Sequence, residues 1–511
     1  MQTALPMVAY YCFLTAMLPP LQRPRSCYSF GDGLRRDPHR DYGRNEAYCD
    51  GALAGSTDIR SISKVVSCDT VLVGCSRALC PIVRYGANSV SINTPEALQG
   101  IHNAKASIKK GDWYKTLDIS AGAPSVQMEI DPRQHAMRRR IMAPAFSERA
   151  LKEAEKLITV SAVKLRGGLS RLPDSDKRGD WTPTRNMGRW ATYFGFDFIA
   201  DLGYGRSFGM LENDENRWVP DVLKNASVFI YYVGYLPFID LVRPLMGSVI
   251  QDYIGGQEAA DSLKYTKLAN SRLAERMELE KQYKAEGKDI SEQRKDTFHY
   301  LLNSKDPVTG KRFTIPQLQA DSALIIAAGS DGVGITLSAT IFYLLANPSV
   351  LSKLTNEIRT AFSSEGEIVN PKLNSLPYLH ACIEETLRMN PPKASSLPRK
   401  VVRGGVRIGD EYFPRGVTLG VPLYVLQHSE DCFRSPWEYI PERWIVDEDS
   451  TKGSSEEEVA QAKSAFAPFL LGPMNCIGKN MSYVALKLAI AHLLWKCDVR
   501  CAGDKLTGGG E

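Results

Sequence analysis

The feature that most constrains this chain is a cysteine that lies between two glycines and is followed at once by an apolar helical pattern. Cys476 stands between Gly472 and Gly478. The apolar residues that follow recur every three or four positions, among them Val484, Leu488, Ala491 and Trp495. This spacing predicts a buried helix. A thiol just before a helix N-terminus is favoured as thiolate, and flanking glycines let a flat, bulky group approach the backbone. The stretch therefore suits a thiolate offered to a planar metal macrocycle, but it is equally typical of an inert cysteine in a tight turn.

Bulk composition is that of a globular protein with enough residues for one large or two ordinary domains. The chain has 511 residues and a formal net charge of +5, which is too small to indicate a nucleic-acid partner. Six of the 11 cysteines precede residue 81, and none lies between Cys80 and Cys382. Because a disulfide framework would tie the body of the fold together, the body is typical of a reducing compartment.

A second informative stretch is a long, helix-compatible segment, Leu318 to Leu345, that contains three glycines within six positions. Each of Gly329, Gly332 and Gly334 costs a helix about 1 kcal/mol relative to alanine. A helix that tolerates them has a kink or a close neighbour there, or it breaks at a domain joint. Asp331 lies beside this gap and is a candidate proton relay.

A third stretch is strongly basic. Asp131 and Pro132 suit a helix start, and His135 and Arg139, four positions apart, share a helix face. Two donors on one face can grip a carboxylate, whereas a solvated basic face is the alternative interpretation.

Further along, the sequence predicts a helix that ends in two prolines and then a run of short strands. Glu385 and Arg388 are three apart and therefore adjacent on that helix. Residues 394–428 alternate as strands separated by Gly and Pro turns, and residues 82–92 read as a hairpin.

In this order along the chain, these motifs resemble those of the cytochrome P450 family. Phe469, Gly472, Cys476 and Gly478 match the family's heme-binding loop, F-x-x-G-x-R-x-C-x-G, but Met474 stands where the family usually has an arginine that pairs with a heme propionate. The resemblance implies that Cys476 is the axial ligand of the heme iron and that its thiolate donates electron density to the iron.

The resemblance also assigns the residues that hold the heme. It implies that His135 and Arg139 contact heme propionates and that Arg399 reaches a propionate as well. Arg138 and Arg140 are then expected to point elsewhere, toward the electron donor.

The glycine-containing helix resembles the family's oxygen-binding helix, A-G-x-D/E-T. Ala328, Gly329 and Asp331 match, but Gly332 replaces the threonine whose hydroxyl helps to deliver protons during O2 cleavage. Glycine has no donor, Ser330 is expected on another face, and Thr336 is one turn away. A water molecule can fill this role; otherwise the enzyme leaks peroxide or uses chemistry without oxygen scission.

The implied fold is mainly α with a small β-sheet (α+β), as one heme domain over residues 81–505. In the family, the Glu385–Arg388 pair and Arg443 form a buried cluster that stabilises the fold around the heme. Ala394 to Leu397 are expected to line the substrate pocket. The aromatic stretch over 229–239 resembles a lid over the substrate, with ordinary core as an equal alternative.

The N-terminal part is atypical for the family. Residues 1–25 hold an apolar run, Met7 to Leu18, which is expected to be a short membrane anchor or a targeting segment. Residues 26–80 are expected to be a disordered or altered leader. The resemblance implies an endoplasmic reticulum membrane protein with its catalytic domain in the cytosol.

The implied function is that of a heme-thiolate monooxygenase. It contains heme b, receives electrons from NADPH through NADPH-cytochrome P450 reductase, and hydroxylates or epoxidises a small apolar metabolite with O2. The texture of the sequence is most like fungal members that make terpenoid or polyketide toxins. Because Gly332 and Met474 depart from the motifs, a heme-thiolate isomerase, dehydratase or peroxide-using enzyme and an inactive family member are the alternatives.

Overall fold

A computed structural model of the chain describes residues 81–102, 107–117, 123–171, 181–234, 249–287, 294–447 and 453–503. The expected anchor or targeting segment (1–25) and the leader (26–80) lie outside these residues. Much of the expected lid over 229–239 also lies outside them. All further structural statements concern the described parts of the chain.

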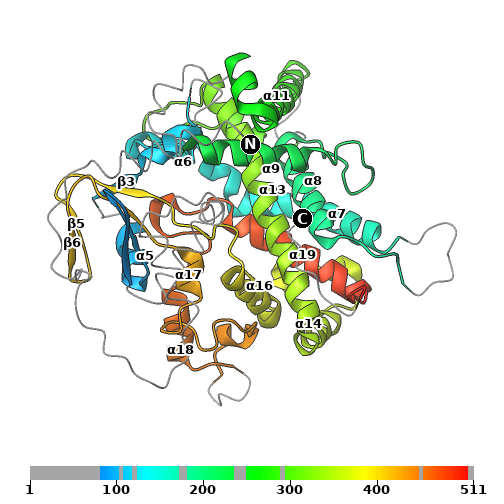
Figure 1. The fold of residues 1–511 in the computed structure, drawn as a ribbon. Helices are drawn as coiled ribbons and strands as arrows, with labels where there is room; N and C mark the ends of the chain where they lie inside the picture. The colour runs from blue at the N-terminus through cyan, green and yellow to red at the C-terminus, as the bar shows by residue number, and fades with distance from the viewer. Residues whose placement is uncertain are drawn as a thin grey trace, which may run out of the picture.

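One long helix, α13 (Ile315–Ala346), runs through the centre of the molecule (Figure 1). It begins with a capping box, in which Thr314 and Gln317 each accept a hydrogen bond from the backbone N–H of the other. Around it pack α8 (Met187–Tyr204), α16 (Pro377–Met389) and α19 (Lys479–Lys496). The predicted C-terminal helix is therefore confirmed, and it forms part of the main hydrophobic core.

The remaining helices and turns surround this centre. The other α-helices of the described residues are α5 (Pro95–His102), α6 (Pro132–Met142), α7 (Glu148–Leu169), α9 (Val219–Gly234), α11 (Val249–Ala285), α12 (Thr297–Asn303), α14 (Pro348–Ala361), α15 (Asn370–Leu373), α17 (Leu423–Gln427) and α18 (Glu456–Ser464). Short 3-10 turns are η1 (Asp112–Leu117), η2 (Ala143–Phe146), η4 (Glu365–Glu367), η5 (Pro441–Trp444) and η6 (Gly472–Met474). The expected start of α6 is confirmed, because the Asp131 carboxylate accepts from the N–H groups of Arg133 and Gln134.

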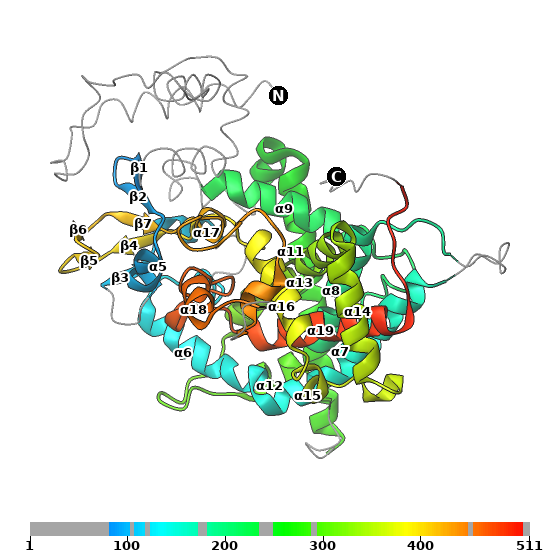
Figure 2. The same ribbon diagram turned by 90° about the horizontal axis from the view of Figure 1, so that it is seen from below.

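A small sheet lies to one side of the helices (Figures 1 and 2). Its strand order is β1-β2-β7-β4-β3, and β2 and β7 run parallel whereas the other pairs are antiparallel. The strands are β1 (Ile82–Gly86), β2 (Ser89–Ile92), β3 (Ile108–Lys110), β4 (Arg399–Val401) and β7 (Thr418–Gly420), with a separate hairpin of β5 (Val406–Ile408) and β6 (Glu411–Phe413). The hairpin predicted over 82–92 is confirmed. The end of the stretch predicted as strands is instead the helix α17.

The glycines of α13 mark the place where α8 approaches it most closely. A Cβ at Gly329 would lie 2.4 Å from the Ile199 side chain, and one at Gly334 would lie 3.1 Å from the Cα of Thr192. On the facing helix, a Cβ at Gly195 would lie 2.4 Å from the carbonyl oxygen of Ser330. Because α13 is helical throughout, a close neighbour explains Gly329 and Gly334, and the helix break at a domain joint is wrong.

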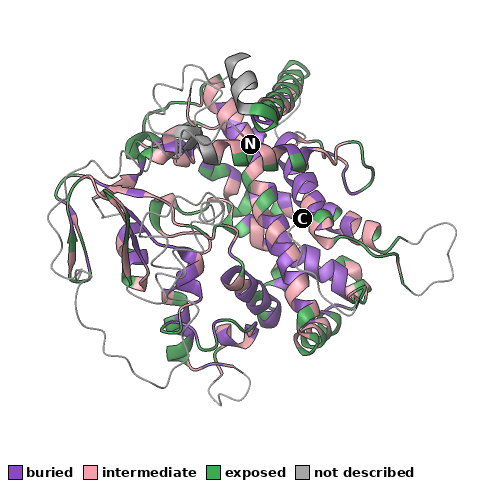
Figure 3. Cartoon of the chain, in the orientation of Figure 1, coloured by how far each residue is buried: buried purple, intermediate pink, exposed green. Residues whose placement is uncertain are grey.

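Burial follows the same arrangement. In Figure 3, α16 is almost entirely buried, whereas much of α11 is exposed. Of the helices in the described residues, α13 alone is long and apolar enough to cross a bilayer, and half of its most apolar stretch is buried inside the protein. The apolar character of α13 is thus explained by its place in the core of the fold.

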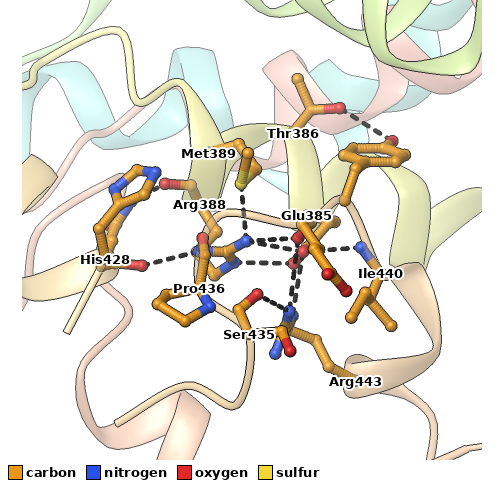
Figure 4. A network of polar contacts seen from close by, with 12 residues as sticks. Glu385, Thr386, Arg388, Met389, His428, Ser435, Pro436, Ile440 and Arg443 are labelled. Carbon is orange, nitrogen blue, oxygen red and sulfur yellow. Dashed lines mark hydrogen bonds and ion pairs between the residues drawn. The ribbon is translucent and has the colours of Figure 1, made fainter. Parts of the chain in front are cut away.

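The predicted three-charge cluster is buried between α16 and the loop before α18 (Figure 4). Glu385 Oε1 lies 2.8 Å from Arg388 Nη2 and 3.0 Å from Arg443 Nε. Arg388 also donates to the carbonyl oxygen of Pro436 (2.7 Å), and Trp444 Nε1 donates to Glu385 Oε2 (3.0 Å). The cluster therefore ties the irregular loop before α18 to α16, as the resemblance to the family implied.

Candidate functional site

The loop that carries Cys476 is closed by its own backbone. The Cys476 N–H donates to the carbonyl oxygen of Phe469 (2.8 Å). Two residues inside the loop have left-handed backbones: Gly472 (φ 68°), where glycine is favoured, and Leu470 (φ 57°), where a side chain is strained. A Cβ at Gly478 would lie 3.9 Å from the Cys476 sulfur, which is ordinary van der Waals contact. Contacts with the protein therefore do not require a glycine at this position.

The thiol of Cys476 is exposed although it lies deep in the fold. Desolvation raises its pKa, and the N–H groups of Gly478 and Lys479 and the charges of Arg139 and Lys479 oppose this rise. The expectation that the helix start favours the thiolate is therefore wrong in its net direction for the protein alone, because burial outweighs the helix terminus. A positively charged metal at the sulfur would reverse the balance.

α6 places its basic face against this loop. Arg139 Nη2 donates to Asn475 Oδ1, the residue before the cysteine, at 2.8 Å. His135, one turn earlier, is buried. Burial, followed by the charges of Lys110 and Arg139, lowers the pKa of His135 to about 3, so the ring is neutral near pH 7. The structure thus brings together three of the residues selected from the sequence: His135, Arg139 and Cys476.

The sheet contributes two more cations to the same region. Lys110 on β3 pairs directly with Arg399 on β4, and both side chains are buried. Like charges directly opposite each other in an antiparallel pair are destabilising. Burial and the charge of Arg399 lower the pKa of Lys110 to about 7. The charge of Glu129 opposes this fall. One carboxylate near two buried cations leaves a net positive charge that suits a bound anion.

The contacts of these cations are all uncharged. Lys110 Nζ donates to the carbonyl oxygens of Val126 (3.1 Å) and Gln127 (2.7 Å). Arg399 Nη1 donates to the Tyr114 hydroxyl (2.9 Å), and its buried Nε has no partner. A buried guanidinium with an orphaned N–H is costly unless an anion is bound.

This donor set fits a heme, whose two propionates are anionic. Lys110, His135, Arg139 and Arg399 influence one another electrostatically, and the charge of Glu129 offsets only part of their positive charge. Arg139 also reaches the loop of Cys476, so these basic side chains and the thiol belong to one region. Among the described residues, no group of three His, Cys, Asp or Glu side chains forms a metal cage, and a single thiol on a macrocyclic metal requires none.

On α13, Asp331 reaches the surface, although protein atoms crowd its carboxylate, and Gly332 faces open space. Nothing lies within 4 Å of a Cβ built at Gly332. Burial among protein atoms raises the pKa of Asp331, and the charge of Lys393 opposes this rise. Asp331 can therefore hold or release a proton closer to neutral pH than an ordinary aspartate does.

The neighbouring hydroxyls of α13 are engaged within the helix. Ser330 Oγ donates to the carbonyl oxygen of Ile326 (2.7 Å), and Thr336 Oγ1 donates to that of Gly332 (2.7 Å). Both side chains are buried. Neither hydroxyl takes the place of the threonine that the family has at position 332.

The expectation that Arg138 and Arg140 point toward an electron donor is wrong for Arg138. Arg138 is fully buried and bonds Asp321 at 2.6 Å. Arg140 is partly exposed, but its Nε lies 2.6 Å from the buried carboxylate of Asp306. Both arginines fix α6 in the fold.

Three residues of the cationic region, His102, Lys110 and Tyr114, carry no local signal in the sequence. His102 is buried, and desolvation and the charge of Arg399 lower its pKa to about 3. Only the pairing of β3 with β4 brings Lys110 and Tyr114 to Arg399, and no local motif indicates that pairing.

Comparisons with known proteins point to one family. The family model for cytochrome P450 matches residues 78–507. The chain is 36% identical to the cytochrome P450 monooxygenase fscF of Fusarium equiseti, over 83% of this chain and 78% of that protein. It is 32% identical to the cytochrome P450 monooxygenase apf7 of Gibberella fujikuroi, over 84% and 80%. The crystal structure of the cytochrome P450DA heme domain has a similar fold, with a TM-score of 0.66 at 17% identity, covering 83% of this chain and 86% of that one.

Proposed function

Because the chain belongs to the cytochrome P450 family, we propose that Cys476 is the axial ligand of its heme iron. Like its relatives, the chain is a heme-thiolate monooxygenase of secondary-metabolite biosynthesis that uses O2 and electrons from a reductase. The observation that carries the assignment is an exposed Cys476 thiol in a closed loop that Arg139 contacts from α6. When bound, the heme activates O2 and transfers one oxygen atom to the substrate.

The propionates are held by His135, Arg139 and Arg399, to which we add Lys110. Support comes from the buried, unpartnered Nε of Arg399 and from the direct pairing of Lys110 with Arg399. Phe469, Gly472 and Gly478 shape the loop: the Phe469 carbonyl oxygen accepts from Cys476, Gly472 provides the left-handed turn, and Gly478 leaves room beside the sulfur.

Asp331 and Gly332 form the proton path on the substrate side. The raised pKa of Asp331 lets its carboxyl exchange a proton, and the open space at Gly332 has room for a water molecule in place of the missing hydroxyl. Thr336 and Ser330 take no part, because their hydroxyls bond the backbone.

The substrate is a small apolar metabolite, which is hydroxylated or epoxidised. The electron donor is NADPH-cytochrome P450 reductase in the endoplasmic reticulum membrane, which the chain contacts from the cytosolic side. Support for this partner and location is the family membership and the similarity to the monooxygenases of fungi.

The test is conversion under labelled oxygen. The full chain is expressed with NADPH-cytochrome P450 reductase and supplied with a panel of small terpenoids and polyketides under 18O2. We expect a product that gains one labelled oxygen atom and forms only with NADPH. Conversion that proceeds without NADPH, or without labelled oxygen, would instead support the isomerase or dehydratase alternative.

A further inference from the structure

Three rings form a line from the Cys476 loop to the protein surface. Phe469, whose carbonyl oxygen accepts from Cys476, has its ring centroid 5.2 Å from that of Tyr483 on α19. The Tyr483 centroid lies 5.4 Å from that of His380 on α16. The His380 side chain is 48% exposed. Aromatic rings therefore connect the proposed iron ligand with solvent, and of the three only the Tyr483 phenol is readily oxidised.

The middle ring of this line carries its own base. The Tyr483 hydroxyl donates to Glu384 Oε1, and the same carboxylate oxygen lies 3.8 Å from His380 Nε2. Burial raises the pKa of Glu384, although the bond from Tyr483 and the charges of Lys479, Lys463 and Lys487 oppose the rise. Glu384 is therefore a stronger proton acceptor than an exposed glutamate.

The surface histidine leaves that proton on Glu384. Burial, followed by the charges of Lys487, Lys479 and Lys463, lowers the pKa of His380 to about 4, so the ring is neutral near pH 7 and is a weak base. An oxidised phenol that kept its proton would carry a positive charge in a buried place, which is unfavourable. An electron can consequently leave Tyr483 only if its proton leaves as well, and Glu384, which already accepts the hydrogen bond from the phenol, receives that proton.

We propose that Tyr483 is a redox-active side chain that drains oxidising equivalents from the heme when no substrate consumes them. The inference rests on the proposed role of Cys476. In the step, one electron passes from the Tyr483 phenol through Phe469 to the oxidised heme centre, the phenolic O–H bond breaks, and the proton forms a new O–H bond on the Glu384 carboxylate. A soluble one-electron reductant such as ascorbate then restores the phenol, which takes its proton back.

Oxidation of Tyr483 in place of the heme would be useful in this chain in particular. Gly332 lacks the hydroxyl that the family uses in the proton path, so peroxide is expected to leave the heme more often than with a threonine. Peroxide that returns to the heme oxidises it whether or not a substrate is bound. An unused equivalent attacks the heme and nearby side chains. If Tyr483 is oxidised instead, a soluble reductant can restore its phenol.

The test uses the heme-loaded full chain without substrate, mixed with hydrogen peroxide and freeze-quenched for electron paramagnetic resonance. We expect a tyrosyl radical signal that is lost in Tyr483→Phe and weakened in Glu384→Gln, which keeps the shape of the acceptor but not its basicity. The matched control is Tyr343→Phe. Tyr343 stacks on Tyr439 with centroids 4.9 Å apart, away from the line of rings, and its loss is expected to leave the signal intact. Heme bleaching by peroxide is expected to be faster in Tyr483→Phe than in this control.

An unchanged signal and bleaching rate in Tyr483→Phe would overturn the inference. If that variant fails to take up heme, spin trapping followed by peptide mass mapping of the wild-type protein decides: an adduct on Tyr483 supports the inference, and adducts elsewhere alone overturn it. The proposed role of Cys476 as the iron ligand is tested separately. If it is wrong, the protein lacks the absorption spectrum of a thiolate-bound heme before any peroxide is added.

Discussion

Arg138 and Asp321 form an ion pair in which both side chains are fully buried, with Nη2 2.6 Å from Oδ2. It joins α6, which carries His135 and Arg139, to the central helix α13. Asp321 Oδ1 also accepts from the N–H of Val126 (2.7 Å), so one carboxylate fixes two segments. The pair therefore sets how the basic face of α6 meets the Cys476 loop.

Removing the carboxylate should be costly. In Asp321→Asn the buried guanidinium of Arg138 loses its counter-charge, and the free energy of unfolding should fall by about 3–5 kcal/mol. Urea unfolding of the heme-loaded protein measures this. The control is Glu153→Gln in the exposed pair with Lys156, which should change that free energy by less than about 1 kcal/mol. Equal effects of the two changes would contradict the role given to Arg138.

Heme retention should depend on Arg399. Arg399→Gln removes a buried cation whose Nε is otherwise without a partner. Because a hydrogen bond to a charged group contributes about 1.5–3 kcal/mol, heme should bind about tenfold more weakly or worse. The rate of heme transfer to an acceptor protein measures this loss. The control is Arg407→Gln, which changes an exposed side chain on β5 and should transfer heme at the wild-type rate. A wild-type rate for Arg399→Gln would contradict the propionate assignment.

A threonine should fit at position 332. Nothing outside the local helix backbone lies within 4 Å of a Cβ there, so the position has room for the first atom of a side chain. The hydroxyl that Gly332→Thr adds should lower the peroxide released per NADPH consumed. Gly332→Ala is the control, because it fills the space without a donor and should release as much peroxide as the wild type. Equal release by the threonine and alanine variants would show that the hydroxyl does not matter here.

The same helix offers a contrast in stability. At Gly332, alanine should stabilise the helix by about 1 kcal/mol relative to glycine. At Gly329, a Cβ would lie 2.4 Å from the Ile199 side chain, so Gly329→Ala should destabilise the fold by about 1–3 kcal/mol. Thermal unfolding of the two variants, compared with wild type, separates the glycine that packing requires from the one that it does not.

Stability should depend on pH through His380. The folded ring takes up a proton only near pH 4, whereas an unfolded histidine does so near pH 6.5. Between these values the unfolded state binds more protons, so this contribution to stability is full above about pH 6.5 and is lost as the pH falls toward 4. The stability difference between wild type and His380→Gln should therefore change across this window and stay constant above it. A constant difference throughout would contradict the lowered pKa.

Local spacing accounts for the parts that the sequence predicted well. Glu385 and Arg388 are adjacent because they are three apart on one helix, and Asp131 caps α6 because a cap acts on the next few residues. The glycine-flanked loop before α19 is likewise a local pattern.

Contacts between distant segments account for what the sequence could not predict. Arg138 looks like part of a solvated basic face until its partner, 183 positions away, is known. Lys110 joins the site only because β3 pairs with β4. The pKa of Cys476 depends on how deeply the folded chain surrounds the sulfur, and burial outweighs the local effect of the helix start.

The central claim is that the Cys476 sulfur binds the heme iron, and the absorption spectrum of the reduced, carbon monoxide-treated protein tests it most directly. The wild-type protein should show a Soret band shifted strongly to the red, as thiolate ligation produces, and Cys476→Ser should lose that shift. A wild-type protein that binds heme without the red-shifted band, or a serine variant that keeps it, would contradict the assignment.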